Sequence, residues 1–288
     1  MEKKAVKTAK RRRRSRRTWR YWVLPLVLVL LCLLVLDSNV RLVTRNYEIP
    51  LAGLPAELDG LRITVLSDLH QRSFGQDNRR LLRAVAAAEP DLIAVTGDLF
   101  DRAGELEYVQ DVMTALLEIA PVYYVSGNHE WPTGQAEIAM ELMRDLGVHV
   151  LENRVELLER GGAGLLLCGI ADKNSYADMP TPEDIMARAA VKGDYVTILL
   201  AHRNTELDAY AAAGFDLVLC GHGHGGVIRL PFVGGLIGPG GDWFPEYDGG
   251  VVQLGHTVGV VSRGLAAARL IPRFLNNPEV VSVILREG

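Results

Sequence analysis

The sequence has little cysteine, with three in 288 residues, and its body shows no internal repeat and no low-complexity linker. Cys32 lies in a long apolar run, while Cys168 and Cys220 each end an apolar segment and precede a glycine. These positions favour small buried side chains over a disulfide or a metal ligand. The composition is 49% hydrophobic and 23% charged, which excludes a disordered chain. The length allows a membrane anchor followed by one large domain.

Basic charge is scarce over most of the chain and dense at its start. Residues 1–20 hold eleven Lys and Arg and a single acid, Glu2. The remaining residues hold 20 basic and 34 acidic side chains, a net charge of about −14. A basic tail on an acidic body argues against nucleic-acid binding by the body.

Residues 21–36 form an apolar run that no charge interrupts. At about 1.5 Å per residue, a helix of this length is slightly shorter than a hydrocarbon core of about 30 Å. Trp19, Tyr21 and Trp22 can form an aromatic belt, and Arg20 can extend towards water. We therefore expect a basic cytoplasmic tail over residues 1–20, a transmembrane anchor or signal-anchor over 21–36, and a folded domain over 40–288.

Basic residues tend to stay on the cytoplasmic side of a membrane. We therefore expect a single-pass protein of the cell membrane, with its N-terminus in the cytoplasm and its folded body outside. A cleaved signal peptide is the alternative, but the residues after Leu36 contain no A-x-A-like site, which favours an uncleaved anchor. Residues 15–19 also resemble a twin-arginine export signal, which would suit a domain that is exported already folded.

The body alternates short apolar runs with helical patterns, which predicts a largely parallel central sheet. The expected strands cover residues 40–51, 61–66, 92–96, 122–125, 195–200 and 217–220, and the expected helices cover 78–88, 105–119, 135–146, 183–190 and 206–213. Residues 148–170 resemble two or three strands. The runs over 251–254, 258–261 and 280–285 have no helix between them, which predicts a second, mixed or antiparallel sheet closing the same domain.

Five predicted strands end in residues that commonly bind metals. The ends read L-S-D-L-H, V-T-G-D, V-S-G-N-H-E, L-L-A-H and C-G-H-G-H, and they carry Asp68, His70, Asp98, Asn128, His129, His202, His222 and His224. The carboxyl ends of parallel strands meet in one crevice, so residues 68 and 224 can come together there. A lone histidine is usually structural, but five of the seven histidines at such ends predict a metal site.

The types of ligand narrow the choice of metal. Imidazole and carboxylate without thiolate suit Zn, Fe or Mn, and are too rich in nitrogen for Ca or Mg. The ligands are too many for one tetrahedral ion, which predicts two divalent ions (Mn, Zn or Fe) that share a bridge. The positive charge that remains at such a centre attracts an anionic phosphate.

Taken in order, D-x-H, G-D, G-N-H-E, a lone H and G-H-x-H resemble the motifs of the calcineurin-like metallophosphoesterase superfamily, over about residues 61–226. The leading anchor, Ser73-Phe74-Gly75 with Asn78, and Ser262-Arg263-Gly264 with Ile271-Pro272 are similar to its membrane-tethered bacterial branch. The resemblance implies an α/β fold, a four-layer α/β/β/α sandwich preceded by an N-terminal transmembrane helix.

The resemblance also implies the roles of the site residues. One metal would be held by Asp68, His70, Asp98 and His224, and the other by Asp98, Asn128, His202 and His222, with Asp98 as the bridge. His129 would meet the phosphate and protonate the leaving group. Two positions depart from the usual pattern: Gly223 stands where Thr is usual, and Ala201-His202-Arg203-Asn204 replaces S-H-x-P. Both departures change residues that neighbour the ligands and not the ligands themselves. They therefore affect how the substrate fits more than whether the site is active.

These features predict a dinuclear metallophosphoesterase, a hydrolase that cleaves a phosphomonoester, phosphodiester or pyrophosphate with a metal-bridging hydroxide. The anchor favours a membrane-associated or lipid-linked phosphate as substrate. A non-catalytic metal-binding scaffold of the same fold is the alternative. Such scaffolds usually lose ligands, whereas every motif position is filled here.

Residues 226–249 begin two residues after His224, and their glycines and prolines favour a loop. The loop carries apolar residues that include Phe232 and Trp243. These side chains either pack on the sheets or form an apolar wall for the acyl or prenyl part of a membrane substrate. The sequence leaves both interpretations open.

Overall fold

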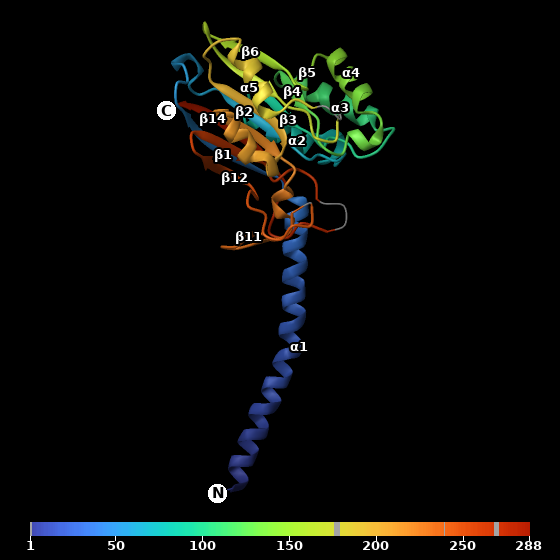
Figure 1. Ribbon diagram of the computed structural model, residues 1–288. Coiled ribbons are helices and arrows are strands. Elements are labelled where there is room, and N and C mark those ends of the chain that lie inside the picture. Colours follow the sequence, from blue (N-terminus) through green and yellow to red (C-terminus); the bar gives the residue numbers. More distant parts are fainter. Residues whose placement is uncertain (1, 176–178, 239, 268–270) are drawn as a thin grey trace.

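The computed structural model describes residues 2–175, 179–238, 240–267 and 271–288. Two six-stranded sheets lie face to face, and one long N-terminal helix projects away from this body (Figure 1). Helices cover the outer face of each sheet. The four-layer α/β/β/α arrangement predicted from the sequence is confirmed.

The first sheet has the strand order β1-β14-β2-β3-β4-β5. Its strands are β1 (Val43–Leu51), β2 (Arg62–Leu66), β3 (Leu92–Thr96), β4 (Val122–Val125), β5 (His149–Val150) and β14 (Glu279–Glu287). The helices packed on its outer face are α2 (Arg79–Ala87), α3 (Leu106–Leu117) and α4 (Ala136–Leu146). Strands β2 to β5 are parallel, so their carboxyl ends share one edge of the sheet.

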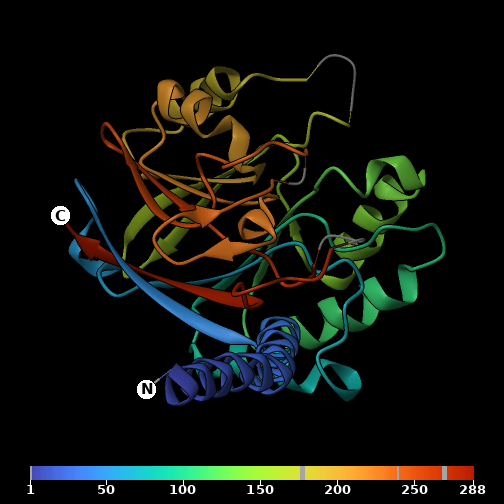
Figure 2. The same ribbon diagram turned by 90° about the horizontal axis from the view of Figure 1, so that it is seen from below.

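The second sheet has the order β12-β13-β9-β8-β7-β6. Its strands are β6 (Val155–Arg160), β7 (Ala163–Gly169), β8 (Thr197–Arg203), β9 (Leu217–Gly221), β12 (Gly250–Leu254) and β13 (Thr257–Val261). Strands β7, β8, β9 and β13 are parallel, and helices α5 (Pro182–Ala190) and α6 (Leu207–Ala213) cover the outer face. Figure 2 shows the two sheets edge-on, with their helices on opposite sides.

Alternate residues of the central strands enter different apolar cores. In β8, Ile198 and Leu200 face the core between the two sheets, while Leu199 packs beneath the outer helices. Successive side chains of a strand point to opposite faces, and both faces of these strands are buried. The sequence therefore shows continuous apolar runs rather than an alternation of apolar and polar residues. Each such side chain stabilises the fold by about 1.5–3 kcal/mol. The strand ends that carry polar residues are therefore fixed on a rigid, densely packed frame.

The three C-terminal strands do not form a sheet of their own. Strands β12 and β13 lie in a second, mixed sheet, but that sheet is built around β8 and β9, which we expected in one central sheet with β2, β3 and β4. Strand β14 instead enters the first sheet between β1 and β2. It pairs parallel with β1 and antiparallel with β2. The physical reason is the inter-sheet core, to which β14 contributes Val281, Val283 and Leu285. Pairing over such a distance along the chain leaves no local signal in the sequence.

The N-terminal helix α1 runs without interruption over Glu2–Val40, so it extends beyond the apolar run that ends at Leu36. Its segment Tyr21–Val40 has a mean hydropathy of 2.5 and is long and apolar enough to cross a membrane once. Only residues 41 and 42 separate it from β1, which consequently begins at Val43 rather than at residue 40.

The end of α1 is bonded to the body. The Asn39 side-chain amide donates to the Arg273 carbonyl at 2.8 Å and accepts from the Arg273 backbone N–H at 3.1 Å. The Asn277 amide donates to the Asp37 carbonyl at 2.8 Å. These bonds fix the direction in which α1 leaves the body, so the helix does not act as a flexible tether.

Residues 226–249 contain the short strands β10 (Arg229–Leu230) and β11 (Gly234–Gly235), which pair as a hairpin. Val227 at its start is buried, as the packing interpretation expects. Phe232 at the turn is fully exposed and Trp243 is 67% exposed, so for these two side chains the packing interpretation is wrong.

Candidate metal centre

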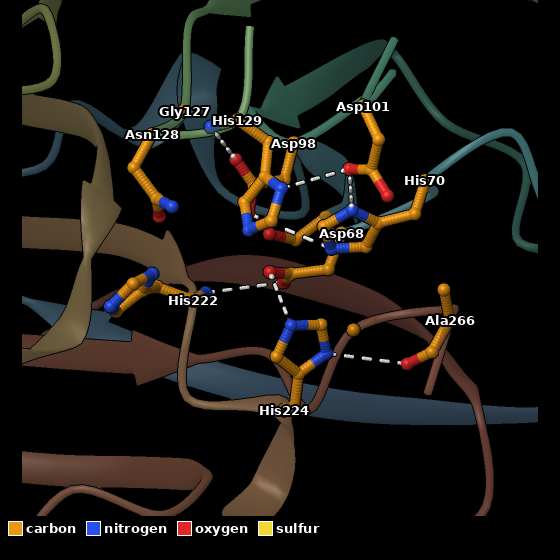
Figure 3. A network of polar contacts seen from close by, with 12 residues as sticks. Asp68, His70, Asp98, Asp101, Gly127, Asn128, His129, His222, His224 and Ala266 are labelled. Carbon is orange, nitrogen blue, oxygen red and sulfur yellow. Dashed lines mark hydrogen bonds and ion pairs between the residues drawn. The ribbon is translucent and has the colours of Figure 1, made fainter. Parts of the chain in front are cut away.

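The polar residues at five strand ends come together in one place. Loops after β2, β3, β4 and β9 and the last residues of β8 bring Asp68, His70, Asp98, Asn128, His129, His202, His222 and His224 around a common centre (Figure 3). The two sheets pack face to face with these ends at the same edge, which is why residues more than 150 positions apart are neighbours: the His222 backbone N–H donates to Asp68 at 3.1 Å.

The ligand atoms form two groups that share one residue. Those of Asp68, His70, Asp98 and His224 lie within 4.8 Å of one another, and so do those of Asp98, His202 and His222. Asp98 Oδ2 lies 3.6 Å from His70 Nε2 and 3.3 Å from His202 Nε2. Asn128 adds an amide oxygen to the second group, with Oδ1 at 3.0 Å from His202 Nε2. All seven residues predicted to bind metal therefore lie in this cluster.

Three of the imidazoles are held in the orientation that metal ligands adopt. Nδ1 of His202 is bonded to the Thr96 carbonyl at 2.8 Å, Nδ1 of His224 to the Ala266 carbonyl at 3.3 Å, and Nδ1 of His70 to Asp101 at 2.5 Å. An Nδ1–H donated to an oxygen leaves Nε2 with a free lone pair, which in each case faces the cluster. This outer contact is typical of histidines that bind metals.

Three buried polar atoms in the cluster have no hydrogen-bond partner among the residues that the structure describes. They are Asp68 Oδ1, His70 Nε2 and Asp98 Oδ2, and all three face the shared centre. A buried polar group without a partner costs about 1–3 kcal/mol, and more when it is charged. Divalent cations would satisfy these carboxylate and imidazole atoms together, so the residues present fit a metal centre.

The electrostatic field of the site keeps its two carboxylates and two of its imidazoles in the form that binds metal, whereas, against the effect of burial, the adjacent carboxylates raise the pKa of His202 and His70. Burial alone would raise the pKa of Asp98, but His202 beside it lowers that pKa overall, and His224 does the same for the buried Asp68. Both carboxyls therefore stay ionised. Burial lowers the pKa of His222 and of His224 to about 4, so these imidazoles stay neutral.

Asp101 belongs to the site although the sequence did not single it out. Its Oδ1 lies 2.5 Å from His70 Nδ1 and 3.0 Å from His129 Nδ1, so one carboxylate orients both rings. The hydrogen bond that His129 donates to the Asp101 carboxylate raises the pKa of His129. The only sequence signal is a second aspartate in the stretch G-D-L-F-D that begins at Gly97, and spacing alone does not show that it faces the histidines.

Glu130 ties together the two loops that carry Asp98 and Asn128. Its carboxylate accepts from the backbone N–H groups of Leu99 at 2.5 Å, Gly127 at 3.0 Å and Asp98 at 3.3 Å. Gly97 allows this close approach, because its φ is +86° and a Cβ there would collide with the backbone of Gly127. The motif contains Glu130, but its role as a clamp becomes visible only in the folded chain.

His129, the predicted acid, differs from the ligands in its exposure. Its side chain is 37% exposed, and its Nε2 lies 4.0 Å from Asp98 Oδ2. The ligand imidazoles of His202 and His224 are almost fully buried. His129 therefore stands at the mouth of the cluster, where a substrate would meet it.

The sequence model described as calcineurin-like phosphoesterase matches residues 61–226, which is more than half of the chain. The chain belongs to this family. The matched range contains every residue of the cluster. Membership makes the protein a metallophosphoesterase, a hydrolase that acts on phosphoester bonds.

Relatives of this family cover most of the chain. A protein named "Uncharacterized metallophosphoesterase YkuE" from Bacillus subtilis is 28% identical over 84% of this chain and 85% of its own. "Phosphodiesterase YaeI" from Escherichia coli is 29% identical over 72% of this chain and 75% of its own. A "Transmembrane protein with metallophosphoesterase domain" from Danio rerio is 26% identical over 84% of this chain and 57% of its own.

The two departures from the usual family pattern touch each other. A Cβ added at Gly223 would lie 2.6 Å from the side-chain nitrogen of Asn204. Asn204 is buried and donates to the Tyr247 carbonyl at 2.6 Å. Asn204 thus occupies the space that a side chain at position 223 would need, and it holds the segment that follows the hairpin. The two positions form one coupled feature rather than two separate ones.

This contact predicts the outcome of restoring the usual residue. Gly223→Thr is expected to lower the free energy of unfolding by about 1–3 kcal/mol, because the new side chain overpacks against Asn204. Adding Asn204→Ala should return part of this loss, measured as a positive coupling in a double-mutant cycle of thermal unfolding. Additive effects of the two substitutions would contradict the coupling.

Proposed function

We propose that this metallophosphoesterase works with two metal ions at a membrane surface. The observation that carries the proposal is the position of Asp98, whose carboxylate belongs to both groups of ligand atoms. Asp68, His70, Asp98 and His224 would hold one ion, and Asp98, Asn128, His202 and His222 the other. The donor set of imidazole, carboxylate and amide oxygen suits Mn, Zn or Fe.

Two ions held in this way would supply an activated water as nucleophile and would neutralise charge on the phosphate. The protein side chains have complementary tasks. Asp98 and Asp68 keep the centre from being too positive, while Asn128 provides a neutral oxygen beside His202. His129, at the exposed mouth, carries a proton on Nε2 towards the leaving oxygen, and Asp101 holds its ring by accepting from Nδ1.

We infer that the substrate is a phosphate ester or pyrophosphate close to a bilayer, for instance a lipid-linked phosphate. The apolar length of α1 and its fixed attachment to the body support this. The concentration of positive charge before Tyr21 favours an N-terminus in the cytoplasm and a catalytic body outside, with the twin-arginine route as a means of export. The relative from Danio rerio is named as a transmembrane protein.

Asp98→Ala is expected to abolish hydrolysis of p-nitrophenyl phosphate esters and to remove at least one equivalent of metal, because both ion sites lose a ligand. Activity assays and metal analysis of the purified protein measure the two effects. Asp145→Ala, at an exposed position of α4, is the matched control and should change neither. Two full equivalents of metal in Asp98→Ala would contradict the dinuclear assignment.

His129→Ala is expected to keep most of the metal and to lose about 10²–10⁴ in kcat, the usual contribution of a positioned acid. Metal content and steady-state kinetics separate the two effects. His149→Ala is the control, because His149 is exposed and bonded to Glu156 rather than to the cluster. If His129→Ala loses both metals, His129 is a ligand and the proposed acid role fails.

The proposed topology predicts that protease added to spheroplasts digests the body while the membrane is intact. The basic residues before Tyr21 are the reason, since they remain on the cytoplasmic side. An immunoblot for the body measures the outcome, with a cytoplasmic enzyme as the control for lysis. Full protection of the body before lysis and digestion after it would reverse the orientation.

A further inference from the structure

Exposed aromatic side chains lie in one short stretch of the body, between the hairpin turn and Phe244, whose backbone N–H donates to the Leu236 carbonyl just after β11 at 2.9 Å. Phe232 is fully exposed, and Trp243, Phe244 and Val233 are 67%, 59% and 54% exposed. We call these four residues the apolar hairpin surface. Among the described residues, the other strongly exposed aromatics are Trp19, Tyr21 and Trp22, which all belong to α1. Large apolar groups gathered on a surface in this way usually mark a place of contact.

The apolar hairpin surface is built on a well-ordered base. The Arg229 guanidinium donates to the Gly225 carbonyl at 2.9 Å, to the Asp248 carbonyl at 2.9 Å and to Asp248 Oδ1 at 3.1 Å. The Gly235 backbone N–H donates to the other Asp248 oxygen. Phe232 at the turn has a φ of +67°, a conformation that bulky residues rarely adopt. Its outward position is therefore imposed by the hairpin.

The same segment holds both the hairpin and the membrane helix. Ile228 forms a bridge with Phe274, and the Arg229 backbone N–H donates to the Phe274 carbonyl at 2.9 Å. The neighbouring residue, Arg273, makes the two backbone bonds to Asn39 in α1. Figure 1 accordingly shows β11 on the side of the body from which α1 leaves.

The length of α1 places this face of the body at the bilayer. The uncharged run of 16 residues over 21–36 spans about 24 Å as a helix, against a hydrocarbon core of about 30 Å. An apolar segment shorter than the hydrocarbon core is accommodated by local thinning of the bilayer or by flanking residues that reach the interface, and either brings the end of α1 close to the headgroups. The two-residue connection to β1 reaches at most about 7 Å, so the body cannot move away from the surface.

We propose that the apolar hairpin surface inserts into the interface of the bilayer that α1 crosses, as a second membrane contact made by the catalytic body. The inference rests on the proposed membrane anchoring of α1. Aromatic side chains favour this depth of a bilayer. The nearby charges do not favour anionic lipids, because Arg229 is paired with Asp248 and the exposed Asp242 and Glu246 are acidic. The contact is therefore apolar and insensitive to salt.

This contact has a consequence for the metal centre. The hairpin begins at Arg229, five residues after the proposed ligand His224, which is itself the first residue of the short turn His224–Gly226. Insertion of the hairpin would hold the centre at a constant height above the lipid headgroups. A phosphate carried by a lipid then reaches the site without leaving the bilayer, whereas a soluble ester reaches it from the water.

The test uses the full chain in nanodiscs of phosphatidylcholine. In a Cys32→Ser background, Phe232→Cys carries an environment-sensitive fluorophore, and Val191→Cys is the matched control, at an 89% exposed position at the end of α5. Cys168 and Cys220 are buried and do not compete for the label. We expect the emission at position 232 to shift to the blue and to be quenched at least threefold more by nitroxide lipids than emission at position 191. Raising the salt concentration should not change this ratio.

The wild-type protein labelled at Cys32 separates the two proposals. Weak lipid quenching at Cys32 would mean that α1 does not cross the bilayer, and the anchoring proposal would fail. Strong quenching at Cys32 with equal quenching by aqueous iodide at positions 232 and 191 would overturn the hairpin contact alone. Protection of position 232 from iodide without lipid quenching would also overturn it, because a second copy of the chain would then cover the surface.

Discussion

The crowding of ionisable side chains around Asp98 is the constraint on which the rest of the structure depends. Two carboxylates and several imidazoles meet at one edge of two packed sheets, and three of their buried atoms have no partner within the described chain. Such a cluster is costly unless cations complete it. It survives because the apolar cores on both sides of each sheet hold the strand ends rigidly. Glu130 adds to this rigidity, since its carboxylate binds the loops after β3 and β4 to each other.

The parts of the fold that the sequence could predict are those with a local or repeated signal. The strand Leu92–Thr96 and the helix that ends at Leu146 follow from an apolar run and an amphipathic pattern, and both are confirmed. The meeting of Asp68 with His222 follows only in part from the rule that parallel strands share their carboxyl edge, because β2 and β9 lie in different sheets and the packing of the two sheets brings these ends together. The place of β14 could not be predicted, because it depends on which gap in the inter-sheet core its valines fill.

The contacts of the site that escaped prediction are those between loops. Asp101 reaches two histidines that lie 31 residues before it and 28 residues after it, and no spacing in the sequence marks that reach. Gly223 and Asn204 look like two unrelated departures from a family pattern, yet one fills the space that the other leaves. The exposure of Phe232 is a similar case, since an apolar residue in a glycine-rich loop is equally compatible with a core and with a surface.

Anchor and metal centre share a chain of contacts, which bears on what the enzyme can reach. The Ala266 carbonyl accepts from His224 at 3.3 Å and from the Arg273 side chain at 2.9 Å, and Arg273 is in turn bonded to Asn39 at the end of α1. A flexible tether would let the site sample every height above a membrane, and most of those heights would be useless for a lipid phosphate. A rigid joint of this kind avoids those unproductive positions. The conformational entropy that is lost in positioning the site is lost once, when the chain folds, and not at each encounter with a substrate. If α1 crosses a membrane as proposed, the same rigidity would limit the enzyme to phosphates that lie within the depth of the headgroups, and selectivity for the substrate would follow partly from the geometry of attachment.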